Sequence, residues 1–221
     1  MNPAPAPAPA HDPKLPEALR HISEATKAHY AQDPLGFWEA TREHDVGQNI
    51  DALLRHVERP APADILDLGC GPGRDLKTFG ELGHRAVGLD GTPAFADMAR
   101  THGGCEVWLQ DLLALNLPPA RFDGIFANAV LFHVPTSALP RVLSELHNAL
   151  RPRGVLFASN PRGNDQEGWQ QNRWGVWHSL EGWRRYMQGA AFEELEHYYR
   201  PAGLPRERQP WLATVWRVLR P

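Results

Sequence analysis

The segment Ile65-Leu-Asp-Leu-Gly-Cys-Gly-Pro-Gly-Arg-Asp75 is the most informative part of the sequence for the fold. Its apolar start predicts a buried strand, and Gly69, Gly71 and Gly73 predict a sharp turn into a following helix. Glycine allows backbone angles that other residues avoid, and it lets a ligand come close to the main chain. In an open parallel sheet, ligands bind at the carboxyl ends of the strands, which is where this turn lies. The segment therefore predicts a ligand site at the end of its strand.

The spacing of these glycines argues against two common nucleotide motifs. A dinucleotide fingerprint, Gly-x-Gly-x-x-Gly, requires glycine at position 74, where the sequence has Arg74. A Walker A loop requires a Gly-Lys-Ser/Thr sequence that does not follow this turn. Asp67, two residues before the first glycine, is unfavourable beside a pyrophosphate but suits a ligand with an ammonium group. The motif therefore points away from NAD and ATP.

Acidic residues also end the next two predicted strands. Asp90 stands where a carboxylate accepts hydrogen bonds from ribose hydroxyls, and Asp111, after Gln110, is placed to meet an adenine edge. Each acid also has a structural explanation, because Asp90 suits the cap of a helix that begins near Thr92, and Asp111 suits the cap of the following turn. Together with Asp67, these acids end three consecutive predicted strands beside a glycine turn, which favours one shared ligand site over unrelated caps.

Strand and helix patterns alternate along the centre of the chain. Strands are predicted at Ile65–Leu68, up to Asp90, from Cys105, from Phe122 and up to Asn160, and the clearest helix is predicted over Ser137–Leu150. Such alternation predicts βαβ units and a parallel sheet covered by helices on both faces.

The flanking segments have different patterns. A helical pattern covers residues 15–57 and is interrupted at Pro34. A polar, Trp-rich stretch follows the core over residues 161–178 and precedes a helix predicted at residues 180–189. Two further strands are predicted towards the end of the sequence, the last of them as part of an edge hairpin.

Composition limits the function classes. The 221 residues suit one α/β domain, and the formal net charge of −3 argues against a general nucleic-acid or anionic-membrane surface. Cys70 and Cys105 form no Cys-x-x-Cys pair, which argues against disulfide and zinc frameworks. No run of 18 apolar residues and no signal-peptide profile occurs, so the expected compartment is the cytoplasm. Alternating Pro and Ala predict a disordered tail over residues 1–13.

The segment from about Asp64 to Asn160 resembles the class I S-adenosylmethionine-dependent methyltransferases. Within that family it is similar to the small-molecule branch of ubiquinone/menaquinone-type and tellurite-resistance-type enzymes. The segments that carry the resemblance are ILDLGCGPGRD, AVGLDGTP, LQDLLAL, FDGIFANAVLFHV and LRPRGVLFAS. The resemblance implies a Rossmann-like, seven-stranded, mostly parallel α/β sheet with helices on both faces, the last strand antiparallel, and an N-terminal helical cap. It implies S-adenosylmethionine as the cofactor and S-adenosylhomocysteine as the product, and the spacing of acids and histidines implies no metal.

On this basis residues 14–221 form a methyltransferase domain. It divides into a helical cap at 14–60, a cofactor-binding core at 61–160, and a substrate-side segment with closing strands at 161–221. The resemblance places Asp90 on the ribose. It also places Asp111 and Leu112 at the adenine, and the glycine turn along the methionine moiety. The predicted cofactor-binding residues are Tyr30, Asp67, Gly69, Cys70, Gly71, Gly73, Asp75, Asp90, Gly91, Thr92, Gln110, Asp111, Leu112 and Asn128.

Methyl transfer from a sulfonium requires the nucleophile, the methyl carbon and the leaving sulfur in line, with at most one general base. His133 and His44 are the candidate catalytic residues, with packing as the alternative for His133 and solvent exposure for His44. Tryptophan and arginine after the fifth strand suit a planar or carboxylate-bearing ligand, with packing on the sheet as the alternative. The candidate substrate-binding residues are Asp45, Asn160, Arg162, Trp169, Arg173, Trp174 and Tyr199.

The sequence thus predicts methyl transfer to N, S or O of a small polar metabolite. One alternative is a tRNA-modifying methyltransferase with a local patch of Arg151, Arg153, Arg162 and Arg173, and the negative charge argues against it. Another is a catalytically silent, cofactor-binding partner subunit, and the intact glycines and acids argue against it. We expect a small-molecule substrate, no nucleic-acid or membrane partner, and a monomer or homodimer.

Overall fold

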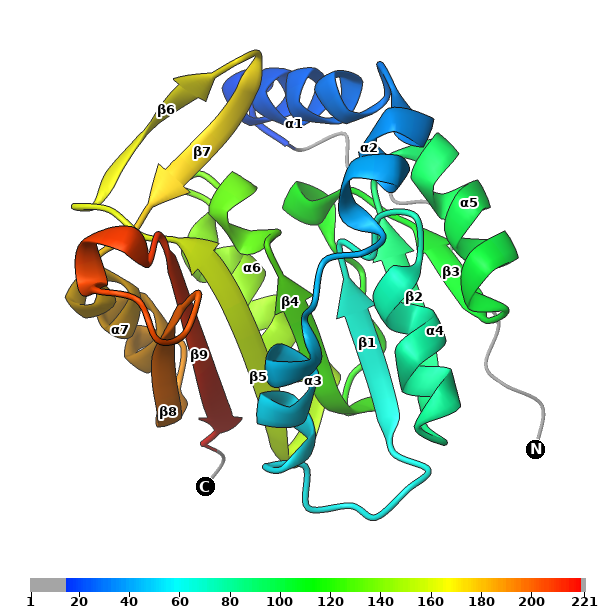
Figure 1. The fold of residues 1–221 in the computed structure, drawn as a ribbon. Coiled ribbons are helices and arrows are strands. Elements are labelled where there is room, and N and C mark those ends of the chain that lie inside the picture. Colours follow the sequence, from blue (N-terminus) through cyan, green and yellow to red (C-terminus); the bar gives the residue numbers. More distant parts are fainter. Residues whose placement is uncertain (1–14, 220–221) are drawn as a thin grey trace.

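The computed structural model describes residues 15–219, so the tail predicted at residues 1–13 lies outside the described residues. The main sheet has seven strands in the order β3-β2-β1-β4-β5-β9-β8 (Figure 1). Its strands are β1 (Asp64–Leu68), β2 (Arg85–Asp90), β3 (Glu106–Leu109), β4 (Phe122–Asn128), β5 (Leu150–Pro161), β8 (Phe192–Arg200) and β9 (Trp211–Val218). Strands β1 to β5 pair in parallel, and β9 runs antiparallel to both β5 and β8. The predicted α/β, Rossmann-like, mostly parallel sheet is confirmed.

The central strands are apolar because both of their faces are covered. Every residue of β1 is buried, and so are the first six residues of β4. On one face lie α3 (Gly47–Leu54), α4 (Arg74–Glu81) and α5 (Pro93–Gly103), and on the other lie α6 (Leu139–Ala149) and α7 (Leu180–Gly189). The sheet therefore forms the middle of three layers, as βαβ units require.

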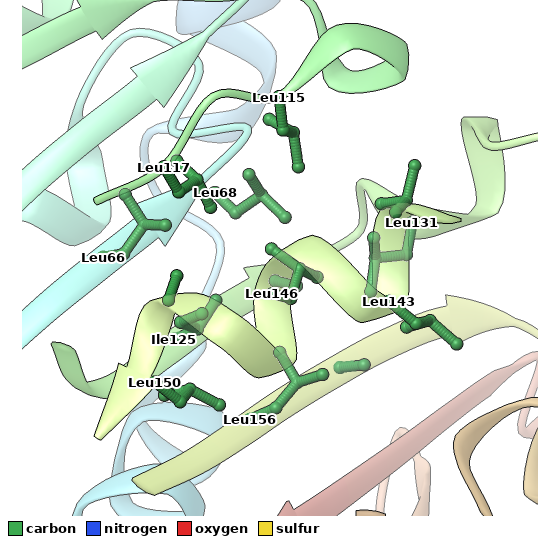
Figure 2. Packing of buried hydrophobic residues seen from close by; sticks show 14 of the residues in the cluster. Leu66, Leu68, Leu115, Leu117, Ile125, Leu131, Leu143, Leu146, Leu150 and Leu156 are labelled. Atoms are coloured by element: carbon green, nitrogen blue, oxygen red, sulfur yellow. The ribbon is translucent and has the colours of Figure 1, made fainter. Parts of the chain in front are cut away.

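Helix α6 shows how the sequence pattern directs this packing. Leu139, Val142, Leu143 and Leu146 recur every three or four residues and are all buried against the sheet. Figure 2 shows Leu143 and Leu146 beside strand residues such as Leu156 in one core cluster. The predicted helix at 180–189 coincides with α7, whose Trp183 joins the same cluster.

The helical pattern over residues 15–57 forms three helices, α1 (Glu17–Tyr30), α2 (Pro34–Thr41) and α3. Pro34 begins α2 and does not merely interrupt a helix, because the Asp33 side chain accepts a hydrogen bond from the Gly36 N–H and caps the new helix. Helix α1 crosses the edge of the sheet where the parallel strands end (Figure 1). Helix α3 instead packs on a sheet face, where Ile50 joins the core. No helix within residues 15–219 is long and apolar enough to cross a bilayer.

One strand prediction needs correction. The Trp-rich stretch contains a hairpin, β6 (Gln166–Gln170) and β7 (Arg173–Trp177), that was not predicted. Its two turn residues, Gln171 and Asn172, both have positive φ, the geometry of a tight two-residue hairpin turn. The edge hairpin predicted for the last strand is formed by β8 and β9, which pair antiparallel at one end of the sheet. Within this hairpin β9 is the inner strand, between β5 and β8, and is almost entirely buried, whereas β8 is the edge strand on that side.

Candidate active site

A cavity of about 750 Å³ opens where the parallel strands end. Residues at or just after the ends of β1 to β5, together with residues at the end of β8 and the start of β9, line it. One half lies over β1, β2 and β3, and we call it the cofactor half. The other half lies over β4, β5, β9 and β8, and we call it the acceptor half. Helices α1 and α2 contribute lining residues to the cavity.

The glycine turn forms the floor of the cofactor half. Gly69, Gly71 and Gly73 all have positive φ, +67°, +52° and +93°, which favours glycine at each position. A Cβ atom at Gly69 would lie 2.3 Å from the Cγ2 atom of Val130, so the turn packs tightly against the end of β4. Gly71 is more open, with Phe37 as its nearest neighbour at 3.8 Å. Gly69 and Gly71 line the cavity, whereas Gly73 packs against α5.

Asp90 lines the cavity and also holds the turn together. One carboxylate oxygen accepts the Gly71 N–H at 3.0 Å, and the other accepts the Thr92 N–H at 2.8 Å. Burial raises the pKa of Asp90, while these backbone donors partly oppose that rise. The helix-capping and ligand-binding explanations are therefore compatible, because each carboxylate oxygen has a further lone pair. Gly91 and Thr92 line the cavity beside it.

Asp67 does not line the cavity. It is buried, and its Oδ2 atom has no hydrogen-bond partner among the described residues. Burial, followed by the nearby carboxylates of Asp75 and Asp90, raises its pKa well above the usual range. The predicted contact between Asp67 and a ligand ammonium group is therefore not supported by this geometry, because the side chain is enclosed within the protein.

Asp111 fastens helix α1 to the sheet. Its Oδ2 atom accepts hydrogen bonds from Ser23 Oγ at 2.5 Å and from Lys27 Nζ at 2.7 Å, and its Oδ1 atom accepts the Leu113 N–H. Burial would raise the pKa of Asp111, but the Lys27 and Ser23 donors hold it below its ordinary value. Asp111 and Leu112 line the cavity as predicted. Gln110 does not line the cavity. Its side-chain amide donates to the Asn116 carbonyl oxygen and accepts the Asn116 N–H.

Arg74, which replaces the glycine of a dinucleotide motif, ties α4 to α2. Its guanidinium pairs with Asp75 through two hydrogen bonds of 2.6 and 2.9 Å and donates to the Thr41 carbonyl oxygen at 2.8 Å. Arg74 and Asp75 both line the cavity as a neutralised pair. Cys70 also lines it, and burial raises the pKa of its thiol, so the thiol remains protonated.

Aromatic residues from α1, α2 and α5 form an apolar wall. The rings of Phe37 and Phe95 lie 5.0 Å apart, and the ring of Tyr30 lies 5.6 Å from that of Phe37 in an edge-on arrangement. All three residues line the cavity. Such a wall suits a planar ring.

His133 belongs to a directed chain of hydrogen bonds. Its Nδ1 atom lies 2.6 Å from the Trp174 carbonyl oxygen, which only accepts, so Nδ1 carries the proton. Its Nε2 atom therefore accepts the Tyr30 hydroxyl proton at 2.8 Å, and Arg173 donates to the Tyr30 oxygen at 3.0 Å. Burial lowers the pKa of His133 to about 4. Both ring nitrogens are thus engaged, and a base role requires Tyr30 to leave Nε2.

The acceptor half is lined by side chains at the ends of four neighbouring strands. Asn128 ends β4 and accepts a hydrogen bond from the Asn49 amide at 3.0 Å. Ser159 lies beside it on β5, Trp211 begins β9, and Arg200 ends β8. These positions place polar, aromatic and cationic groups opposite the glycine turn.

His44 and Asp45 also line this half, but they lie in the exposed loop between α2 and α3 and not on a helix as predicted. The loop conformation is fixed locally, because the Asp45 side chain accepts the Gly47 N–H at 2.9 Å. The predicted substrate residue Asp45 is thus at the cavity, and so is the predicted catalytic residue His44.

The other predicted substrate residues do not line the cavity. Asn160 follows the lining residue Ser159, and Tyr199 precedes the lining residue Arg200. Because successive strand residues point to opposite faces, Asn160 and Tyr199 point away from the cavity. Arg162 donates to the carbonyl oxygens of Gln209 and Arg206 and so fixes the loop before β9. These residues therefore support the walls of the site.

Trp169, Arg173 and Trp174 dock the β6–β7 hairpin on α1. Trp169 is 47% exposed and packs against His21 and Trp174, and the Trp174 N–H donates to Thr26 Oγ1 at 3.1 Å. The hairpin lies beside α1 in Figure 1. Their position explains the local abundance of tryptophan by packing, which is the alternative that the sequence left open.

Several lining residues were missed from the sequence. Ser23 and Lys27 lie four residues apart on α1, so both are on one helix face. This spacing could have indicated a polar face of the helix directed at the site. Phe37 and Phe95 belong to helices whose apolar residues looked like ordinary core. The missed lining residues include Ser23, Lys27, Phe37, Arg74, Phe95, Ser159, Arg200 and Trp211. Within residues 15–219, no cluster of three or more His, Cys, Asp or Glu side chains has the geometry of a metal site.

Comparisons with known proteins agree with this arrangement. Residues 65–154 match the methyltransferase domain family. The chain is 38% identical over 116 residues to the trans-aconitate 2-methyltransferase of Azoarcus sp. (strain BH72), which covers 52% of this chain and 45% of that protein. It is 34% identical over 154 residues to the enzyme of the same name from Acidovorax sp. (strain JS42), covering 66% and 58% respectively. The chain therefore spans about half the length of the curated relatives it matches.

Among solved structures, the chain is similar to Burkholderia thailandensis 1,6-didemethyltoxoflavin-N1-methyltransferase, whose structure holds 1,6-didemethyltoxoflavin and S-adenosylhomocysteine. The TM-score is 0.76 at 23% sequence identity, with 98% of this chain and 95% of that chain covered. This similarity establishes the fold along nearly the whole chain. Residues 65–154 thus match the methyltransferase domain family, and the strand order and the glycine turn of the whole chain are those expected from the resemblance to class I S-adenosylmethionine-dependent methyltransferases.

Proposed function

We propose that this protein transfers a methyl group from S-adenosylmethionine to N, S or O of a small polar molecule. The observation that carries the proposal is the continuous cavity that joins the Gly69–Gly73 turn and Asp90 to the strand ends of the acceptor half. Its volume of about 750 Å³ lies in the range of ligand pockets, roughly 300–1,000 Å³, and leaves room for a nucleoside cofactor with a small acceptor.

The residues of the cofactor half fit such a cofactor. Asp90 retains lone pairs for ribose hydroxyls, and the rings of Phe37 and Phe95 with Leu112 provide apolar contacts for a planar base. The positive φ of Gly71 and the absence of a side chain there expose the backbone to the cavity. These features suit an adenosyl group better than a pyrophosphate, for which the cavity offers acidic side chains.

When bound, S-adenosylmethionine supplies a methyl group already activated by its sulfonium charge. The protein then has to align the acceptor and exclude water. Helix α1 is suited to water exclusion because Ser23 and Lys27 fasten it to Asp111. Asn128 and Ser159 lie at the junction of the two halves, where they can orient an acceptor. His133 is neutral near pH 7 and bonded to Tyr30, so positioning is its best-supported role.

A small acceptor is supported over RNA. By their names, the curated relatives act on trans-aconitate, and the structural neighbour acts on 1,6-didemethyltoxoflavin. Two of the four arginines expected to form an RNA patch pair with carboxylates, since Arg151 pairs with Asp64 and Asp123, and Arg153 pairs with Glu58. Arg162 instead donates to backbone oxygens, and Arg173 donates to the Tyr30 hydroxyl. The charge of the expected patch is therefore partly neutralised, and its other donors are engaged locally.

The Asp90→Asn and Asp90→Ala variants test the cofactor site by calorimetry with S-adenosylmethionine. Loss of a charged hydrogen-bond acceptor is worth about 1.5–3 kcal/mol, so affinity should fall by roughly 10- to 100-fold. Asp97→Asn is the matched control, because Asp97 is an exposed acid on α5 that pairs with Arg100 outside the cavity. Equal affinity of Asp90→Asn and wild type would show that the ribose assignment is wrong, and circular dichroism checks that each variant is folded.

A further inference from the structure

The cations that line the cavity differ in how they are neutralised. Lys27 pairs with Asp111, and Arg74 pairs with Asp75. Arg200 lines the acceptor half, yet it forms no ion pair with any residue in the described range 15–219. Its one hydrogen bond there runs from Nη2 to the backbone oxygen of Asp45, at 2.7 Å. A guanidinium has five N–H donors, so most of its hydrogen-bonding capacity is available to a ligand.

Arg200 and Trp211 form a composite wall of the acceptor half. They are directly paired across β8 and β9, and directly paired residues of antiparallel strands point to the same face. Both line the cavity, at the strand ends farthest from Asp90 in the sheet order. An aromatic ring beside a guanidinium suits a planar anionic group, because the ring supplies apolar contact and the guanidinium supplies paired donors.

The Ser159 hydroxyl lies in the same half. Ser159 is only 2% exposed and lines the cavity on β5. Its hydroxyl forms no hydrogen bond with any residue of the described part of the chain. Because Ser159 lines the cavity, this hydroxyl is available to hydrogen-bond a polar ligand in the acceptor half.

One acid faces Arg200 from the opposite loop. The Asp45 carboxylate lines the same half, but it accepts the Gly47 N–H and makes no ion pair with the guanidinium. The Asp45 carboxylate therefore lowers the local positive potential, while only the Asp45 backbone oxygen occupies a donor of Arg200. Across the cavity, the Asp90 side chain accepts backbone N–H groups at the cofactor end and forms no ion pair with a residue in the range 15–219. The cofactor end thus presents an acidic group, and the acceptor end presents a guanidinium with most of its donors available.

We propose that the acceptor molecule carries a carboxylate group, and that Arg200 binds this carboxylate while Ser159 donates a further hydrogen bond and Trp211 packs against the adjoining plane. The inference rests on the proposed methyltransferase function and narrows its substrate class. Guanidinium and carboxylate match in shape and form two parallel, charge-assisted hydrogen bonds. Anchored in this way, the rest of the acceptor extends from β8 towards Asn128 and the cofactor half.

Three matched pairs of probes test the proposal: nicotinate and nicotinamide, benzoate and benzamide, and trans-aconitate and its trimethyl ester. Binding to the protein saturated with S-adenosylhomocysteine is measured by calorimetry, and turnover is measured by release of S-adenosylhomocysteine from S-adenosylmethionine. The variants are Arg200→Gln, Arg200→Lys and the control Arg208→Gln. Arg208 is an exposed arginine near Arg200 that does not line the cavity.

We expect at least one acid to bind wild type at least tenfold more tightly than its neutral partner. Arg200→Gln should weaken the binding of that acid by about 10- to 100-fold and should act on turnover chiefly by raising KM. Arg200→Lys should bind the acid more tightly than Arg200→Gln but less tightly than wild type. Arg208→Gln should match wild type, and affinity for S-adenosylmethionine should be unchanged in every variant.

Two results would overturn the inference while the proposed function stands. One is a wild type that binds S-adenosylmethionine but prefers no acid over its neutral partner, and the other is an acid preference that survives in Arg200→Gln. A wild type that fails to bind S-adenosylmethionine would contradict the proposed function itself and this inference with it. Calorimetry without acids separates that result from the first two.

Discussion

The Gly69→Ala substitution tests how tightly the glycine turn packs against the end of β4. Gly69 has φ +67°, and an alanine in the left-handed region costs about 1–2 kcal/mol. The new Cβ would lie 2.3 Å from Val130 Cγ2 and 2.7 Å from Val130 Cβ, and overpacking of this kind costs about 1–3 kcal/mol. Alanine also stiffens the unfolded chain, which returns roughly 0.4–1 kcal/mol. We expect a net loss of about 3 kcal/mol in the free energy of unfolding.

Further variants separate strain from contact. Gly83 has φ +82°, and a Cβ added there would have no atom within 4 Å, so Gly83→Ala should show only the conformational cost, about 1 kcal/mol or less. In the double variant Gly69→Ala/Val130→Ala, the closest contacting atom is removed, so the two changes should be less than additive. Urea denaturation followed by tryptophan fluorescence measures the wild type, the Gly69→Ala, Gly83→Ala and Val130→Ala variants, and the double variant. Equal losses for Gly69→Ala and Gly83→Ala would refute the close packing of this turn.

Three further predictions concern helix α1 and its neighbours. Tyr30→Phe removes the hydroxyl that donates to the buried His133 Nε2 atom and accepts from Arg173. Urea denaturation should therefore show a free energy of unfolding lower by about 1–3 kcal/mol, and an unchanged midpoint would contradict the hydrogen-bond chain. The pKa of His133 is about 4 in the folded protein and about 6.5 when unfolded, so the unfolded state binds more protons between these values. Stability should therefore fall as pH drops from about 6.5 to about 4. His133→Asn should have a shallower slope there, and an equal slope would argue against the depressed pKa. Lys27→Met should speed amide hydrogen exchange in α1 by weakening its attachment to Asp111, an effect that unchanged exchange would disprove.

The cofactor half of the site could be predicted because its signals are local. The spacing of the glycines predicts the backbone conformation of the turn, and the predicted ends of the second and third strands place Asp90 and Asp111 at the same edge of the sheet. Central strands such as β1 are recognisable because burial on both faces requires continuous apolar residues. Asp67 shows the limit of this reasoning, because the sequence does not reveal that its side chain is enclosed beneath the ligand surface.

The acceptor half was harder to predict because it depends on which face each strand residue occupies. Ser159 and Arg200 line the cavity, whereas the sequence predicted their neighbours Asn160 and Tyr199 as substrate-binding residues. Because successive strand residues point to opposite faces, an error of one residue exchanges the two faces. The β6–β7 hairpin escaped detection for another reason. Its turn uses Gln171 and Asn172 without a glycine, although Asn172 is a residue type that tolerates positive φ.

Calorimetric titration of the wild-type protein with S-adenosylmethionine, S-adenosylhomocysteine, NAD and ATP tests whether this cavity binds an adenosyl sulfonium and not a pyrophosphate. We expect both adenosyl compounds to bind at one site per chain, with Asp90→Asn weakening each, and we expect neither NAD nor ATP to compete with them. Binding of NAD or ATP in place of the two adenosyl compounds would contradict the account of this cavity.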